Sequence, residues 1–303
     1  MKLGQLPAGD LARRLAGPGL ALRTGPFNVR VRSAIDTVQR ALGLLYDGHS
    51  LVDDDEFCDF TLEVASPAGL RRWVRPQVQV RHEGQLLFEP LPLAHAHPLL
   101  EWTMNWWISG HAHQYLLLHA AVIERGGRAA ILPAPPGSGK STLCAGLIHR
   151  GWRLLSDEMA LISLATGDLV GLARPVSLKN ASLRVIREFV PGAVLSEPAH
   201  DTAKGSVAHL RPKPEDVARA AEPARPAWVV FPRYLPDVEA TLAPRAKADA
   251  MMELGSNAFN YGLLGREGFE CLAEVISASE CFDFSYSRLD DAVTVFDHLA
   301  SAR

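Results

Sequence analysis

The segment A-P-P-G-S-G-K-S at residues 134–141 constrains the fold of this chain more than any other feature. It matches the phosphate-loop pattern G-x-x-x-x-G-K-[ST] except at the first position, where Ala134 replaces glycine. An apolar run at residues 129–132 precedes it, and residues 140–150 are typical of a helix that stops at Gly151. A strand, a glycine-rich loop and a helix in this order predict an α/β fold, with the loop at the carboxyl edge of a sheet.

Each residue type in this loop has a physical reason to bind a triphosphate. Glycines let consecutive backbone N–H groups converge on the β- and γ-phosphates, and the free N–H groups at the helix start add positive potential. The lysine supplies an ammonium group to the β,γ oxygens, and the serine hydroxyl completes the shell of a magnesium ion. We therefore expect ATP and Mg²⁺ as ligands. The residues expected to bind them are Pro136, Gly137, Ser138, Gly139, Lys140, Ser141 and Thr142.

Two acids follow the loop after one predicted helix and one short predicted strand. The strand covers residues 153–156 and ends in Asp157 and Glu158. We expect it to run beside the strand that leads into the loop, because the carboxyl ends of both would then open into one crevice. There the carboxylates would hold Mg²⁺ together with Ser141, and one of them would accept the proton of an attacking hydroxyl. A solvated acidic turn is the alternative interpretation.

The rest of the sequence predicts two domains. Apolar and polar residues alternate at 29–32, 60–64 and 78–82, so residues 1–114 are predicted to form a β-rich N-terminal domain and a linker helix. Residues 115–303 alternate short strands with helices and are predicted to form the ATP-binding domain.

Two segments within these domains allow more than one interpretation. Trp102 and Trp106 share one face of the linker helix, where packing between the domains is favoured over stacking on a base or sugar. Residues 191–226 are rich in proline, glycine and charge, and are predicted to form a surface loop.

Composition excludes several classes of protein. Of the 303 residues, 48% are hydrophobic and 21% are charged, which is enough to bury a core and argues against disorder. The net charge is -3 and basic residues are scattered, so neither nucleic acid nor an anionic membrane is an expected partner. The four cysteines are not spaced as metal ligands or redox pairs, and the sequence contains no secretory or membrane-spanning apolar run. We expect a cytoplasmic protein without membrane insertion.

Several motifs together are similar to those of the HPr kinase/phosphorylase superfamily, and more narrowly of the HprK-related kinase A family. The core motifs are G-S-G-K-S-T at 137–142, L-I-H-R-G-W-R-L-L-S-D-E at 147–158, and H-A at 119–120. Further matching segments are E-W at 101–102, R-P-V-S-L-K-N at 174–180, K-G-S-V-A-H-L-R-P at 204–212 and N-A-F-N-Y at 257–261.

This resemblance implies a phosphate-loop core like those of HPr kinase and phosphoenolpyruvate carboxykinase. Asp157 matches the acid that serves as base towards a serine hydroxyl, and His119 would lie near the γ-phosphate. Glu158 stands where the family usually has a second aspartate, and Thr142 replaces an acidic residue. The implied catalytic residues are Asp157, His119 and Lys140, and the implied metal ligands are Ser141, Glu158 and Asp157.

Four further side chains are candidates for the same site. Lys179 either clamps a phosphate or lies on the surface beside a helix. Lys204, His209 and Arg211 lie in a glycine-containing polar segment, which either closes over the nucleotide or is a solvated loop.

The expected function is transfer of the γ-phosphoryl group of ATP to a hydroxyl, with a serine of a peptide or protein as the favoured acceptor. An ATP-binding switch that hydrolyses ATP without an acceptor is one alternative, and a small-molecule kinase acting on a sugar is another. The resemblance implies a PqqD-like peptide-binding protein as a further partner, and a homo-oligomer is left open.

Overall fold

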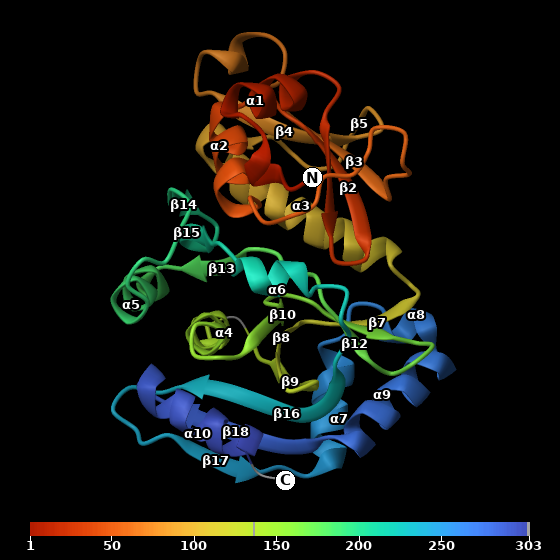
Figure 1. Cartoon of the computed structure of the whole chain (residues 1–303), viewed down its shortest axis with the longest axis vertical. Coiled ribbons are helices and arrows are strands. Elements are labelled where there is room, and N and C mark those ends of the chain that lie inside the picture. The colour runs from red at the N-terminus through yellow and green to blue at the C-terminus, as the bar shows by residue number, and fades with distance from the viewer. Residues whose placement is uncertain (136, 302–303) are drawn as a thin grey trace.

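The computed structural model describes residues 1–135 and 137–301. Within these residues the strands form four sheets, and helices surround them in a mixed α/β architecture, as predicted. Figure 1 shows the N-terminal third, coloured red to yellow, above the remainder of the chain. The predicted division between residues 114 and 115 stays a prediction.

The N-terminal part contains one mixed sheet in the order β1-β2-β3-β4-β5, with β6 also paired to β4. In β2 and β3 every second residue is buried, which explains their alternating sequence. The strands of this sheet are β1 (Leu20–Thr24), β2 (Phe27–Arg32), β3 (Phe60–Ala65), β4 (Gln77–His82), β5 (Gln85–Leu86) and β6 (Leu91–Pro92). The accompanying helices are η1 (Leu3–Gln5), α1 (Ala8–Ala16), α2 (Asp36–Leu45), η2 (Leu70–Arg72), η3 (Leu93–His95) and α3 (Ala96–His111).

Helix α2 lies between β2 and β3, inside the part of the chain that is predicted to be rich in strands. It buries Val38, Ala41, Leu42 and Leu45, whose spacing is that of one helix face. The helix also explains why β2 and β3 pair in parallel, since parallel neighbours need a crossover connection.

The central sheet has the order β10-β8-β9-β16-β18-β17. Pairing is parallel between β9 and β16 and between β16 and β18, and antiparallel elsewhere. Its strands are β8 (Ala120–Arg125), β9 (Arg128–Pro133), β10 (Arg153–Ser156), β16 (Arg225–Tyr234), β17 (Thr241–Pro244) and β18 (Glu280–Tyr286).

Helices cover both faces of this sheet. Ala121 and Ile123 belong to the hydrophobic cluster with α4 (Lys140–Ile148) and α10 (Leu289–Ser301). The alternate residue Val122 belongs to the cluster with α7 (Lys247–Ser256) and α9 (Arg266–Ala278). The short helix α8 (Tyr261–Leu264) connects α7 to α9. A strand buried on both faces explains the continuous apolar run in β8.

Two small sheets complete the fold. One has the order β12-β11-β7 and the other β13-β15-β14. Their strands are β7 (Tyr115–Leu118), β11 (Ala160–Ser163), β12 (Leu169–Val170), β13 (Val176–Lys179), β14 (Ala199–Thr202) and β15 (Gly205–Leu210), with helices α5 (Ala181–Phe189) and α6 (Pro214–Ala218) alongside. The prediction of a surface loop over 191–226 is therefore wrong, because β14, β15 and α6 lie within it.

The N-terminal part and the remainder share hydrophobic packing. The cluster that fills the N-terminal sheet also contains Leu117, Met159, Leu161 and Leu172. In Figure 1, α3 lies on the side of the N-terminal part that faces β13 and α6.

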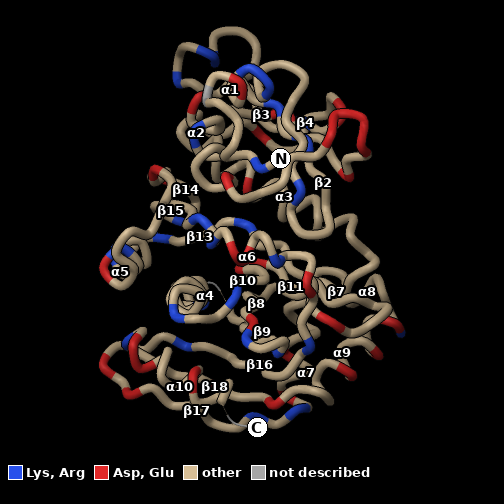
Figure 2. The backbone as a smooth tube through the Cα atoms, viewed as in Figure 1, with Lys and Arg blue, Asp and Glu red and all other residues tan. Residues whose placement is uncertain are grey.

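Figure 2 shows acidic and basic residues distributed over both parts of the chain. Within residues 1–135 and 137–301, none of the helices combines the length and apolar character that crossing a membrane requires.

Candidate functional site

The loop between β9 and α4 has the backbone geometry that its glycines suggest. Gly137 and Gly139 have φ angles of 88° and 89°, a region that residues with a Cβ rarely adopt. A Cβ on Gly139 would lie 2.5 Å from the Tyr286 hydroxyl oxygen, whereas one on Gly137 would meet nothing within 4 Å. Gly139 is thus required for both conformation and space. Pro136, a predicted nucleotide-binding residue, lies outside the residues that the structure describes.

Two hydrogen bonds hold the loop against the ends of the parallel strands. The Tyr286 hydroxyl donates to the carbonyl oxygen of Gly139 at 2.9 Å, and the Tyr234 N–H donates to that of Ser138 at 2.8 Å. Burial raises the pKa of Tyr286, so its hydroxyl stays protonated and remains a donor. The loop is therefore held in place by residues that lie 96 and 147 positions later in the chain.

The Lys140 ammonium is buried without a hydrogen-bond partner among the described residues, and the whole residue is only 7% exposed. A buried, unpaired cation is costly, and this observation fits an anionic ligand at the same position. Ser141 is half-buried beside it. The Thr142 hydroxyl donates to the Ser182 hydroxyl of α5 at 2.6 Å, so this predicted nucleotide-binding residue has a contact inside the protein.

The prediction that the acid-bearing strand runs directly beside the strand leading into the loop is wrong. β10 pairs with β8, not with β9. Because both β9 and β10 are antiparallel to β8, they run in the same direction and end at the same edge. The two acids therefore follow β10 at the edge where the phosphate loop follows β9.

Asp157 is a buried carboxylate with one free oxygen. Its Oδ2 accepts the Ser177 N–H at 3.0 Å, while Oδ1 has no partner among the described residues. Burial and the adjacent charge of Glu158 raise the pKa of Asp157 to about 6, against the opposing effect of Lys140 and Ser141. A carboxyl that titrates near neutral pH is suited to accept and return protons.

Glu158 lies between the His119 ring and the Lys179 ammonium. Its carboxylate lies 3.4 Å from His119 Nε2 and 3.5 Å from Lys179 Nζ. Burial disfavours the ionised form, but His119, Lys140 and Lys179 outweigh it and hold the pKa of Glu158 well below its ordinary value. The two neighbouring acids thus have opposite pKa shifts, an arrangement that separates a proton acceptor from a permanently charged group.

His119 lies at a break between two sheets. The apolar run at 116–123 is divided into β7 and β8, and the N–H of His119 donates to the carbonyl oxygen of Asn257 at 2.9 Å. The break turns the His119 side chain towards Glu158. Asp157, Glu158, His119 and Lys179 are therefore brought to one place, near Lys140.

A cavity of about 740 Å³ opens beside the acids. Asp157, Glu158 and Lys179 line one part of it, and side chains from the N-terminal part line another. The described residues of the phosphate loop do not line it. Asp157 lines the cavity and also lies close enough to Lys140 for their charges to interact.

The predicted polar segment with Lys204, His209 and Arg211 is a β-hairpin, not a loop that closes over the site. Lys204 and His209 line the cavity, whereas Arg211 forms an ion pair with Asp47 at 2.7 Å. His209 is buried, and burial lowers its pKa to about 3, so its ring is neutral and packs on the His97 ring at 4.8 Å.

Sequence reasoning did not identify a buried polar cluster between α3 and the segment that leads into β13. Arg174 contacts the Glu101 carboxylate at 2.6 Å and the Asn105 side-chain oxygen at 2.6 Å. The Tyr46 hydroxyl donates to Glu101 at 2.8 Å. Burial disfavours the charge on Glu101, but Arg174 and His97 hold the pKa of that carboxyl below its ordinary value. The sequence feature that could have indicated this cluster is Glu101, an acid that directly follows the apolar residues Leu99 and Leu100 on a helix.

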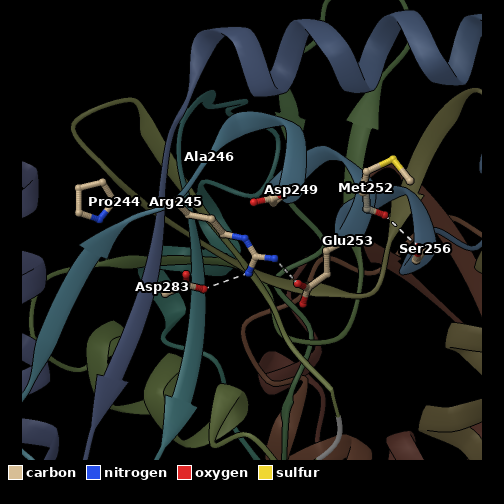
Figure 3. A pocket seen from close by; sticks show the side chains of 8 residues that line it. All are labelled: Pro244, Arg245, Ala246, Asp249, Met252, Glu253, Ser256 and Asp283. Atoms are coloured by element: carbon tan, nitrogen blue, oxygen red, sulfur yellow. Dashed lines mark hydrogen bonds and ion pairs between the residues drawn. The ribbon is translucent and has the colours of Figure 1, made fainter.

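A second cavity of about 660 Å³ lies at the far edge of the central sheet, where β17 leads into α7. Figure 3 shows Arg245 between Asp283 and Glu253, at 3.0 Å and 2.6 Å. The Arg245 guanidinium also covers the Phe231 ring at 3.9 Å. The charges of Arg245, Asp283 and Glu253 are thus paired with one another, and this cavity shares no lining residue with the first.

Within the described residues, no group of three or more His, Cys, Asp or Glu side chains surrounds a metal position. A magnesium ion at this site would instead be held mainly by phosphate oxygens with one or two protein ligands, as is usual for Mg²⁺. The unpaired Lys140 ammonium and the unpaired Asp157 oxygen fit such a metal-bound triphosphate.

No protein-family model matches this sequence, and no curated protein matches it. A solved structure, the Hpr(Ser) kinase/phosphatase from Coxiella burnetii, is similar to 61% of this chain over 97% of its own length, at 12% identity and a TM-score of 0.25. A similarity at this level establishes neither a shared fold nor a shared function.

Proposed function

We propose that this chain is a kinase that transfers the γ-phosphoryl group of ATP to a hydroxyl, with a serine of a peptide or protein as the acceptor. One observation carries the proposal: a buried, unpaired ammonium on Lys140 lies at the same sheet edge as a buried carboxylate with a free oxygen, Asp157. We also propose that residues 115–303 form an HPr-kinase-like core and that residues 1–114 form a separate N-terminal domain. The resemblance to the HprK-related kinase A family supports this proposal.

The phosphate loop has the groups needed to bind the nucleotide. Backbone N–H groups at Gly137 and Gly139 and the Lys140 ammonium would contact the β- and γ-phosphates. Ser141 and Glu158 would hold Mg²⁺, which neutralises charge on the β,γ oxygens when bound. His119 pairs with Glu158 and keeps that carboxylate oriented and charged.

Asp157 is assigned as the general base. As the acceptor oxygen attacks the γ-phosphorus, its proton moves to the Asp157 carboxylate and the bond from the γ-phosphorus to the bridging oxygen breaks. The products are the phosphorylated hydroxyl and ADP. The free Oδ1 supports this role, because Oδ2 is held by Ser177 and fixes the orientation of the carboxylate.

The proposal is tested with γ-labelled ATP, Mg²⁺ and a lysate of peptides and proteins. We expect label on serine, its loss in Lys140→Ala and Asp157→Asn, and capture of the acceptor by ATP-loaded Asp157→Asn protein. Lys247→Ala, an exposed lysine bonded to the Ser277 carbonyl, is the matched control and should keep full activity. Label released only as inorganic phosphate would favour an ATP-binding switch that hydrolyses ATP without an acceptor. An ATP affinity that is unchanged in Lys140→Ala would overturn the assignment of residues 134–141 as a phosphate loop.

A further inference from the structure

The cavity beside Asp157 has a wall that the proposed phosphoryl transfer does not use. This wall comes from the N-terminal part of the chain, from residues 88–105, which include β6 and the first part of α3. The acids come from the end of β10. Its apolar lining residues are Phe88, Leu91, Pro92, Pro98, Leu99 and Trp102. The same wall also contains the polar residues Glu89, His95, Glu101 and Asn105, so an acceptor that fills the cavity would contact apolar and polar groups.

Large apolar side chains of the wall are partly open to solvent. Trp102 is 46% exposed and Leu91 is 37% exposed. The Trp102 ring lies 4.3 Å from the Phe88 ring, so the two form a continuous aromatic surface. Such a surface binds a flat or branched apolar group, with a gain from burial and from ring contact.

The size of the cavity restricts what can occupy it. A volume of about 740 Å³ is that of a pocket for a small molecule or a few side chains, and a folded domain cannot enter it. An acceptor serine on a protein must therefore be presented on a short, extended segment. Side chains adjacent to the serine would then fill the part of the cavity next to Trp102.

Building on the proposed kinase activity, we propose that the cavity is the acceptor site and selects a serine with an aromatic or large aliphatic side chain close to it in a flexible peptide segment. Trp102 and Phe88 bind the apolar side chain, and Asp157 faces the serine hydroxyl. The N-terminal part thereby determines which serine is phosphorylated, while the phosphate loop binds ATP.

The test uses a positional-scanning library of short synthetic peptides with one central serine and each position beside it varied in turn, with γ-labelled ATP and Mg²⁺. Because burial of a large apolar side chain is favourable, we expect kcat/KM to be roughly ten- to hundredfold higher for Phe, Leu or Trp than for Gly at one or two positions. Trp102→Ala should reduce that preference to about threefold or less, by raising KM and not by lowering kcat.

Trp106→Ala is the matched control, because Trp106 is 39% exposed on the same helix, packs on Phe88 and does not line the cavity. It should keep the wild-type preference, and both variants should keep the wild-type ATP affinity and unfolding temperature. Serine phosphorylation without any apolar preference, or a preference that survives Trp102→Ala, would overturn the acceptor-site inference alone. Absence of phosphoserine on every peptide would overturn the proposed peptide kinase as well.

Discussion

At the scale of single residues, the protonation of Asp157 decides whether the site can accept a proton. Its carboxylate is buried and lies next to the negative charge of Glu158. Burial and the neighbouring charge both favour the protonated form of Asp157. Glu158 stays ionised through His119 and Lys179, so one negative charge is retained at the site while the other titrates. The difference between two adjacent acids arises from their surroundings, since their residue types alone predict similar pKa values.

We predict that the transfer rate rises with pH through about 6 and levels off above it. Asp157 must be deprotonated to act as base, and its pKa is about 6, so each pH unit below that value should lower the rate about tenfold. The measurement is kcat at saturating ATP from about pH 5 to about pH 8. Asp157→Asn should lower the rate roughly 10²- to 10⁴-fold and remove this titration, and an unchanged profile in that variant would exclude Asp157 as the base.

At the scale of elements, the loop between β9 and α4 depends on two strands that lie beside it in space but come much later in the sequence. β16 and β18 end beside the loop, and their tyrosines bond to the carbonyl oxygens of Ser138 and Gly139. The first N–H of α4 to close a helical bond, at Leu143, also bonds to Gly139. Gly139 therefore connects the loop, the helix and the parallel strands.

We predict that alanine is tolerated less well at Gly139 than at Gly137. Both positions have positive φ angles, which cost roughly 1–2 kcal/mol for alanine, but only at Gly139 would the new Cβ meet the Tyr286 oxygen. Gly139→Ala should weaken ATP binding at least about tenfold and lower the unfolding temperature more than Gly137→Ala does. Calorimetry measures ATP affinity and thermal unfolding measures stability for both variants. Equal effects at both positions would argue against the close approach of a Gly139 Cβ to the Tyr286 oxygen.

At the scale of the whole molecule, a buried ion pair joins the N-terminal part to the acid-bearing part. Arg174 lies shortly before Ser177, whose N–H holds Asp157, and it contacts Glu101 of α3. The same helix carries Trp102 into the cavity wall. Placement of the wall relative to the acids therefore depends on this contact.

We predict that removing one partner of this pair destabilises the protein strongly. Arg174→Met or Glu101→Gln alone should lower the free energy of unfolding by about 3–5 kcal/mol, because a buried charge is left unpaired. The combined variant should recover part of that loss. Urea unfolding measures the effect, and Arg266→Ala, which breaks the exposed pair with Glu270, should change little. Additive losses in the double variant would show that the two side chains do not act together.

The sequence alone predicts the strand, loop and helix of the phosphate site, because these depend on neighbouring residues. Positive φ angles at Gly137 and Gly139 and the helix from Lys140 are local properties. The sequence also predicts the acids after β10 as a candidate site, whereas it does not predict that β10 pairs with β8.

Only the tertiary structure decides which distant residues meet. His119 reaches Glu158, and Arg174 reaches Glu101, through contacts set by how the sheets and α3 pack. The position of β8 between β9 and β10 is likewise a matter of which faces bury the most apolar surface. Such contacts depend on the summed packing of many residues, and no short stretch of sequence encodes them. The local pattern therefore determines the glycine-rich loop before α4, whereas the packing determines the carboxylates beside it and the cavity that they line.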